Sequence, residues 1–218
     1  YKWGTHRDML RQVSTYGILA CGMTIVIITG GIDLSVGSVL GLTAVMFSVL
    51  IVNKGWPAAV AVPACLLMGA GLGAVSGGLI AGFGLQPFIA TLAMMVFARG
   101  LAKYASGGQK IAASVQDAQG NFGVPKVFDL LDARLFDGNI TFVTIVLIVC
   151  VVLCGVLLAR TRQGRYLYAI GGNESAAHLS GLPVGRLKIA AYALSGFFAA
   201  VAGICQAGQE QQGDPEAG

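Results

Sequence analysis

Residues 160–188 read RTRQGRYLYAIGGNESAAHLSGLPVGRLK, and this stretch sets the direction of the apolar segments on either side of it. It carries five of the 14 basic residues against a single acid, Glu174, and it lies between two uncharged apolar runs. Lysine and arginine beside membrane spans are biased to the cytoplasmic side, because carrying them across the bilayer is unfavourable. We therefore predict that 160–188 is a cytoplasmic loop between two spans.

The composition predicts a membrane protein with an all-α fold. Hydrophobic residues make up 56% of the chain and charged residues only 11%, whereas soluble domains carry about 25% charged residues. Uncharged runs of about 18 residues or more are typical of membrane-spanning helices. We expect a single transmembrane domain over 1–218, a polytopic helix bundle of about six spans that is truncated at both ends. The expected limits of the spans are 13–30, 34–52, 57–81, 87–105, 139–159 and 189–207.

Two long apolar runs must each contain a break. Residues 12–53 hold one charge, Asp33, in 42 positions, and a straight helix of that length would be about 63 Å long, twice the hydrocarbon thickness. The first break is predicted at Gly30-Gly31. Residues 55–98 repeat the pattern, with a break predicted over 82–87.

The orientation of the loop at 160–188 can be propagated backwards along the chain. The polar residues 106–137 then form an external loop. Arg7 and Arg11, ahead of the first span, also fall outside the cell, against the charge bias. An earlier span upstream of residue 1 would remove this conflict, and so would a re-entrant first pair of segments.

The loop at 160–188 contains the signals of a short helix. Asn173 is a good N-cap, and Glu174 beside it suits the positive end of a helix dipole. Gly181 suits the left-handed residue that ends a helix, and Pro183 prevents continuation. These signals predict a helix over 174–180, about 10 Å long. On the cytoplasmic face it would be a handle for a soluble partner, and an ordinary connecting turn is the alternative.

Asp33 is the acid that most needs an explanation. A carboxylate inside a span costs about 2.5–3.5 kcal/mol, so such acids usually face water, a partner or a substrate route. Asp33 can equally cap the next span through the N–H groups of Ser35 or Val36. Gln86 and Thr91 can line a route for a polyhydroxylated solute, or they can act as caps or as contacts between helices.

Other residues are interpreted as packing rather than chemistry. Gly69, Gly73 and Gly77 recur every fourth residue, continued by Gly78 and Gly82, and predict close approach between helices. All five cysteines lie in apolar runs. Although Cys150 and Cys154 share a helix face, no His, Asp or Glu lies in the same span to complete a metal site.

The sequence does not indicate an enzyme or a nucleic-acid partner. It contains no nucleophile–base pair, phosphate loop or nucleotide motif, so any energy would come from another polypeptide. The net charge of +4 follows the loops, which is a matter of topology.

Three blocks of the sequence resemble a known family in both order and spacing. Residues 30–38 read GGIDLSVGS and residues 86–92 read QPFIATL. The third block combines GRY at 164–166 and AIGGNE at 169–174 with Ala176-Ala177 and Ser180-Gly181. Together they resemble the permease subunits of bacterial ABC importers for ribose, xylose, arabinose and galactose, over essentially the whole chain.

The resemblance implies a multi-pass subunit of the bacterial inner membrane that imports a pentose or hexose by alternating access. The implied partners are a cytoplasmic ABC ATPase, a periplasmic sugar-binding protein, the lipid bilayer, and a second permease copy in a homodimer or heterodimer. The chain itself would carry no cofactor, because ATP binds to the partner. Two other functions stay open: an ion-coupled secondary solute carrier that uses Asp33, and a scaffold or sensor subunit that moves no solute.

Candidate functional residues lie within these blocks. The candidate translocation pathway consists of Asp33, Ser35, Gln86, Phe88 and Thr91. The implied ATPase-coupling residues coincide with the helix expected at 174–180 and its flanks. They are Gly172, Asn173, Glu174, Ala176, Ala177, Ser180 and Gly181.

Overall fold

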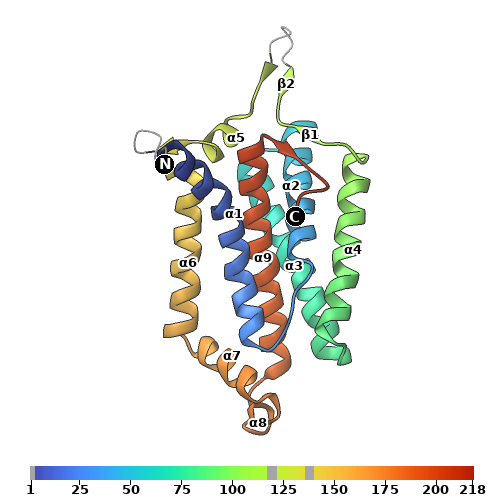
Figure 1. Cartoon of the computed structure of the whole chain (residues 1–218). Helices are drawn as coiled ribbons and strands as arrows, with labels where there is room; N and C mark the ends of the chain where they lie inside the picture. The colour runs from blue at the N-terminus through green and yellow to red at the C-terminus, as the bar shows by residue number, and fades with distance from the viewer. Residues whose placement is uncertain (1–2, 117–121, 136–139) are drawn as a thin grey trace.

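The computed structural model describes residues 3–116, 122–135 and 140–218, without the side chains of 3–8, 115–116 and 122. Within these residues the chain is an all-α bundle (Figure 1), and six helices are long and apolar enough to cross a membrane. The predicted fold class is confirmed. The elements in chain order are α1 (Trp3–Ile28), α2 (Val36–Ser48), the π-helical turn η1 (Val49–Asn53), α3 (Ala58–Phe83), α4 (Pro87–Ser106), β1 (Ile111–Ala112), β2 (Val115–Gln116), β3 (Phe122–Gly123), α5 (Lys126–Leu131), β4 (Arg134–Leu135), β5 (Ile140–Thr141), α6 (Phe142–Arg160), α7 (Arg162–Gly172), α8 (Glu174–Leu179), α9 (Val184–Glu210) and β6 (Gln212–Gly213).

Both predicted breaks are present. In the first apolar run, α1 ends at Ile28, and Gly30 two residues later adopts a left-handed conformation with φ 76°. The chain then runs without regular structure to Val36, which starts α2. The second run ends at Phe83, followed by left-handed Gly84 (φ 65°), and α4 begins at Pro87. Proline suits this first-turn position because its missing N–H has no partner within the helix.

α9 is the central helix, and it packs against α1, α2 and α3 (Figure 1). A Cβ added to Gly69, Gly73 or Gly77 would come within 2.8 Å of the α9 main chain, closer than real Cβ contacts allow. The predicted packing role of these three glycines is confirmed. Gly78 and Gly82 meet no neighbour within 4 Å among the described residues, so the extension of the pattern does not serve this interface.

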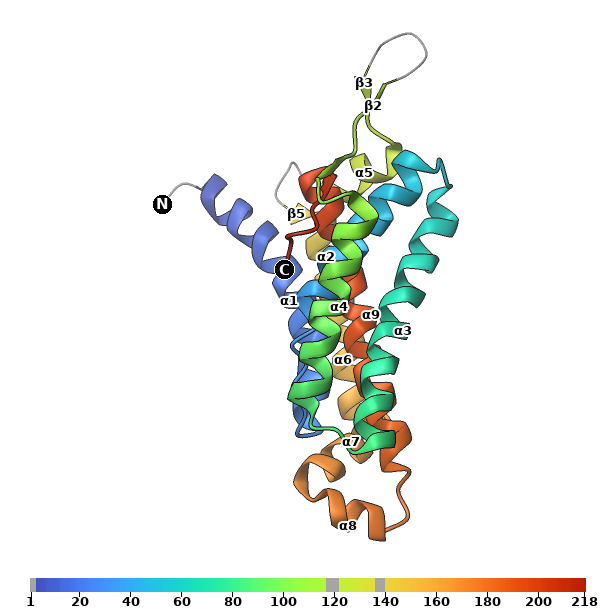
Figure 2. The same ribbon diagram turned by 90° about the vertical axis from the view of Figure 1, so that its right-hand side faces the viewer.

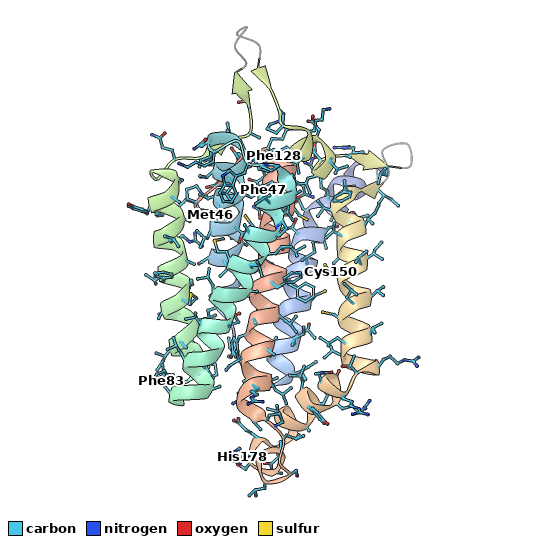
Figure 3. All side chains as sticks on the ribbon, turned by 180° about the vertical axis from the view of Figure 1, so that it is seen from behind. Met46, Phe47, Phe83, Phe128, Cys150 and His178 are labelled. Carbon is cyan, nitrogen blue, oxygen red and sulfur yellow. The ribbon has the colours of Figure 1, made fainter. Side chains whose placement is uncertain are left out.

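The two ends of the bundle differ. α7 and α8 protrude at one end, and α5 with the β2–β3 pair lies at the other (Figures 1 and 2). We refer to these as the α8 end and the α5 end. The strands pair antiparallel as β1–β6, β2–β3 and β4–β5. The described part of 106–137 is not only a polar loop, because it contains α5, which buries Phe128 with its ring 5.3 Å from that of Phe47 (Figure 3).

Arg11 lies at the α5 end, the same end as loop 106–137, as the propagated topology requires. Its guanidinium forms an ion pair with Asp132 and donates to the carbonyl oxygen of Gln209 in the last turn of α9. The C-terminal end of a helix favours a positive charge. These contacts compensate the charge of Arg11 within the bundle. The side chain of Arg7 is outside the described part.

After α9 the chain folds back beside α2 and α4 (Figure 1). Asp214 pairs with Lys110 at 2.7 Å, and Glu216 pairs with Lys103 at 2.7 Å. Burial favours the neutral form of Asp214, but the hydrogen bonds from Lys110 and from the N–H of Glu216 and the charges of Lys110 and Arg99 together outweigh it. They hold the Asp214 pKa below its usual value. The hydrogen bond from Lys103 lowers the pKa of Glu216.

Candidate functional site

The site at the α8 end begins with the corner between α6 and α7. The Thr161 hydroxyl donates to the carbonyl oxygen of Leu157 at 2.6 Å and accepts the N–H of Gly164 at 3.1 Å, so it caps α7. α7 is amphipathic, with Leu167 and Ile170 buried. Sequence reasoning missed this helix. The signals that reveal it are the Thr161 cap and the apolar residues three apart at 167 and 170.

The predicted loop helix is present as α8, one residue shorter than expected. The Asn173 side chain accepts the N–H of Ala176 at 2.9 Å, which is the expected cap. Gly181 is left-handed (φ 80°), and the N–H of Leu182 bonds to the carbonyl oxygen of Ala177 at 3.2 Å. These bonds pair main-chain N–H and C=O groups at both ends of the helix, and all the partners are neighbouring residues.

Most of α8 faces outwards. Ala177 is its one buried residue, and His178 lies at the tip of the molecule (Figure 3). Leu179 is 87% exposed, although it is a large aliphatic residue at the extreme end of the bundle. Sequence reasoning did not select Leu179.

An ion pair connects α8 to the central helix, in addition to the apolar packing of Ala177. Lys188 Nζ in the first turns of α9 lies 2.6 Å from Glu174 Oε1. The Lys188 side chain is 17% exposed and that of Glu174 54%. Because Glu174 is exposed, solvent screens the pair, and its contribution is that of a surface pair, about 0–1 kcal/mol. Lys188 is a site residue that sequence reasoning missed, because it lies 14 positions from Glu174, beyond a turn.

A second connection joins α7 to the end of α1. A Cβ on Gly171 would overlap the carbonyl oxygen of Ile28 and lie 3.0 Å from its carbonyl carbon. The neighbouring Gly172 would meet nothing within 4 Å. Only glycine therefore allows α7 to lie directly on the last turn of α1, next to the break at Gly30-Gly31.

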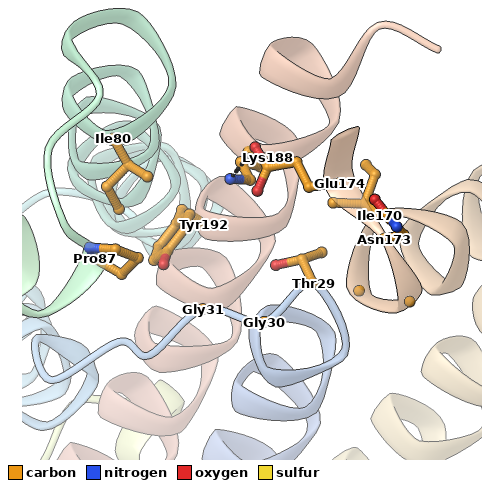
Figure 4. Close-up of a pocket in the computed structure, with 12 residues that line it drawn as sticks. Thr29, Gly30, Gly31, Ile80, Pro87, Ile170, Asn173, Glu174, Lys188 and Tyr192 are labelled. Carbon is orange, nitrogen blue, oxygen red and sulfur yellow. Dashed lines mark hydrogen bonds and ion pairs between the residues drawn. The ribbon is translucent and has the colours of Figure 1, made fainter. Parts of the chain in front are cut away.

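These elements surround a cavity of about 330 Å³ (Figure 4). It brings together the cap and first residue of α8, the break after α1, and Pro87 at the start of α4, so all three sequence blocks meet there. An adjoining hollow of about 520 Å³ lies between the end of α3, α8 and the start of α9. The residues that line the first cavity are Thr29, Gly30, Gly31, Ile80, Pro87, Ile170, Gly171, Gly172, Asn173, Glu174, Lys188 and Tyr192.

Asp33 follows the cavity residue Gly31 by two positions, does not itself line the cavity, and is 2% exposed. One carboxylate oxygen accepts the N–H of Ser35 at 3.0 Å and the Ser35 hydroxyl at 2.6 Å. The other accepts the Ser195 hydroxyl of α9 at 2.8 Å. The capping alternative is therefore realised through Ser35, although Ser35 itself is the residue at the N-cap position of α2. Asp33 also joins the start of α2 to the central helix.

The irregular segment before α2 is held by its main chain as well. The Ile32 carbonyl oxygen accepts a hydrogen bond from the Tyr192 hydroxyl at 3.4 Å. The Thr91 hydroxyl lies 3.5 Å from the same oxygen but donates its proton to the carbonyl oxygen of Pro87 at 2.8 Å. Irregular backbone at membrane depth is tolerated only where protein or a cavity satisfies its polar groups. The structure thus places Asp33 and Thr91 around one segment, whereas Gln86 and Phe88 at the start of α4 are exposed.

Comparison with known proteins identifies the family. The family model described as "Branched-chain amino acid transport system / permease component" matches residues 7–218. The chain belongs to this permease family. It is 41% identical over 213 residues to the ribose import permease protein RbsC of Escherichia coli K12, covering 97% of this chain and 63% of that protein. It is 43% identical over 191 residues to the fructose import permease protein FruG of Bifidobacterium longum, covering 86% of this chain and 54% of that protein.

A third relative extends the range of bacteria. The ribose import permease protein RbsC of Bacillus subtilis is 39% identical over 211 residues, covering 97% of this chain and 62% of that protein. The chain therefore spans between about half and two thirds of the length of these relatives. No solved structure gives a significant match to it. The resemblance to sugar importer permeases is confirmed, as is the prediction of a multi-pass membrane protein.

The cysteines play no part in this site. All five are free and buried in the bundle, as their interpretation as core residues predicts. The described residues contain no group of three or more His, Cys, Asp or Glu side chains that could hold a metal ion. The permease site is therefore built from hydrogen bonds, one ion pair and close main-chain contacts.

Proposed function

We propose that the chain forms the membrane subunit of an ATP-driven monosaccharide importer. It would work as a dimer with a cytoplasmic ABC ATPase and an external sugar-binding protein, in the bacterial inner membrane. The names of the relatives, which are ribose and fructose import permeases, support a pentose or hexose as the solute. The chain needs no cofactor for this role, since ATP binds to the partner.

The observation that carries the proposal is the way α8 is connected. α8 projects from the bundle, presents Leu179 to a partner, and is tied to α9 through Glu174 and Lys188. Through Gly171 the same unit rests on the last turn of α1. A movement of α8 is thereby passed to both helices that border the cavity.

The proposed cycle follows from these connections. When ATP draws the two ATPase subunits together, they pull on α8 of each permease copy. α9 and the end of α1 then shift relative to α3 and α4, so the cavity at the α8 end opens or closes. Rigid-body rocking of one group of helices against another is the usual route to alternating access.

The ion-coupled alternative has less support. Three neutral donors already occupy the carboxylate of Asp33, from Ser35 and Ser195. A cation site would need those oxygens as ligands. Membership of a transport-system permease family also favours an importer driven by a partner ATPase.

The decisive experiment asks on which side of the membrane α8 lies. Ser175→Cys in the full-length permease is labelled with a membrane-impermeant maleimide, in intact cells and in inverted vesicles. All five native cysteines are buried, so the unsubstituted protein gives the background. Labelling only in inverted vesicles is expected. Labelling from outside the cell would rule out a cytoplasmic ATPase as the partner of α8.

A second measurement tests the contact with the ATPase. Leu179→Ala should lower sugar-stimulated ATP hydrolysis by the reconstituted complex, because it removes the exposed apolar side chain of α8. Thr24→Ala, an exposed residue on α1 away from α8, is the matched control. Equal stimulation in both variants would count against a role of Leu179 in coupling.

A further inference from the structure

A polar groove lies between α1 and α9 at the α5 end, opposite α8. It consists of two adjoining hollows of about 180 Å³ and 260 Å³, which share Gln12, Gln209 and Glu210. We call it the α1–α9 groove. Its other lining residues are Arg11, Thr15, Tyr16 and Gln206, and none of the lining residues is aliphatic.

This polarity is unexpected at such a position. The groove lies in the first turns of the span Met9–Ile28 and the last turns of the span Val184–Glu210. The outward face of α6 shows what lipid contact selects, since Val149, Val152 and Leu153 are each at least half exposed. Amides and a carboxylate on a lipid-facing surface would be unfavourable. The groove is therefore suited to water or a polar solute.

The inner wall of the groove is rigid. The Thr15 hydroxyl donates to the side-chain oxygen of Gln209 at 3.3 Å, and the Gln209 amide donates to the carbonyl oxygen of Arg11 at 3.2 Å. Along α9, the Gln206 amide donates to Glu210 at 2.9 Å. The guanidinium of Arg11 is directed to Asp132. These bonds fix the side chains before any solute arrives.

The outer wall has hydrogen-bonding groups to spare. Gln12 and Tyr16 are exposed, and neither side chain bonds to any residue in the described part of the chain. Gln12 offers two donors and an acceptor oxygen, and Tyr16 offers a hydroxyl and an aromatic face. The smaller hollow alone has the volume of about six waters at ~30 Å³ each.

We propose that the α1–α9 groove is a binding site for a neutral polyhydroxylated solute, on the side from which the solute enters. Amide and carboxylate groups match alternating donors and acceptors on a sugar, and the face of Tyr16 matches its C–H surface. The groove carries one acid, and its arginine is already paired, so its charge does not select an anion. This inference rests on the proposed importer function and adds a solute contact remote from α8.

The test uses the full-length permease with its ATPase and binding protein in cells that lack other sugar uptake. Initial uptake of radiolabelled D-ribose and D-fructose gives KM and maximal rate for Gln12→Ala, Tyr16→Ala and Tyr16→Phe. Gln12→Ala should raise KM about three- to tenfold, which is about 0.7–1.4 kcal/mol at 1.4 kcal/mol per factor of ten. Tyr16→Phe should recover part of the loss in Tyr16→Ala, because it keeps the aromatic face. Thr24→Ala, on the same helix outside the groove, should leave KM unchanged.

A second readout does not depend on transport. Gln206→Cys is alkylated with an impermeant maleimide with and without millimolar sugar, and the transported sugar should slow the labelling whereas sodium chloride of equal osmolarity should not. Unaltered KM in all three groove variants together with no protection would overturn the inference and leave the importer function intact. Failure of the unsubstituted permease to take up any sugar would overturn the proposed function, and the inference with it.

Discussion

The close contact between α7 and α1 gives a sharp test of how α8 communicates with the bundle. Gly171→Ala places a methyl group where the carbonyl oxygen of Ile28 already lies. Both atoms belong to or are fixed on main chain, so no side chain can rotate to relieve the overlap. α7 must lift from the end of α1, and α8 moves with it.

The size of the effect follows from packing. Methyl groups forced into a well-packed interface cost about 1–3 kcal/mol. A gap of about 0.5–1 Å removes a quarter to a half of the dispersion energy of each contact across it. If the cost falls on coupling, then at 1.4 kcal/mol per factor of ten the stimulation of ATP hydrolysis by sugar drops about five- to 150-fold.

The assay measures ATP hydrolysis by the reconstituted full-length transporter with and without its sugar-loaded binding protein. Gly172→Ala is the matched variant, because a Cβ at this adjacent position meets nothing within 4 Å. The loss of sugar-stimulated ATP hydrolysis in Gly172→Ala should be at least fivefold smaller than in Gly171→Ala. Thermal unfolding is measured to check that both variants fold. Equal stimulation in the two variants would refute the idea that the contact of α7 with Ile28 transmits the motion.

Three further predictions concern stability and are checked by thermal or denaturant unfolding in detergent. Asp33→Ala should destabilise the chain by about 3 kcal/mol and Ser195→Ala by about 1 kcal/mol, because the first leaves several buried donors unpaired and the second removes one bond; equal losses would contradict this assignment. Gly73→Ala should lower the unfolding temperature because its methyl group would overlap the α9 main chain, whereas Gly71→Ala meets no neighbour and should leave the unfolding temperature unchanged or raise it through better helix propensity. A lower unfolding temperature for Gly71→Ala than for Gly73→Ala would show that α3 does not pack on α9 as described. Because the folded-state pKa of Asp214 is lowered, its ionised form stabilises the fold above about pH 4, and this stabilisation is lost as the pH falls through the folded-state pKa. Asp214→Asn should therefore reduce the loss of stability at acid pH. An unchanged dependence of stability on acid pH would show that the pairing with Lys110 does not contribute.

Much of the site was predictable where the signal is local. The helix α8 follows from Asn173 and Gly181, whose capping bonds involve only neighbouring residues. α7 was not predicted although its cap at Thr161 is equally local, because Arg162 and Arg165 interrupt its apolar pattern. Gln86 and Phe88 show the reverse case, since a motif names them but the fold leaves them exposed.

The sequence by itself determined the class of protein, the six spans and both breaks between them. These depend on chain length against bilayer thickness and on glycine and proline, which act within a few residues. Only the tertiary structure decided that Asp33 bonds to Ser195, 162 residues away, and that Arg11 pairs with Asp132, 121 residues away. Spacing cannot reveal such partners, because nothing in the local chain records which helices lie side by side. Packing around α9 makes that choice, and it also sets α7 on the end of α1.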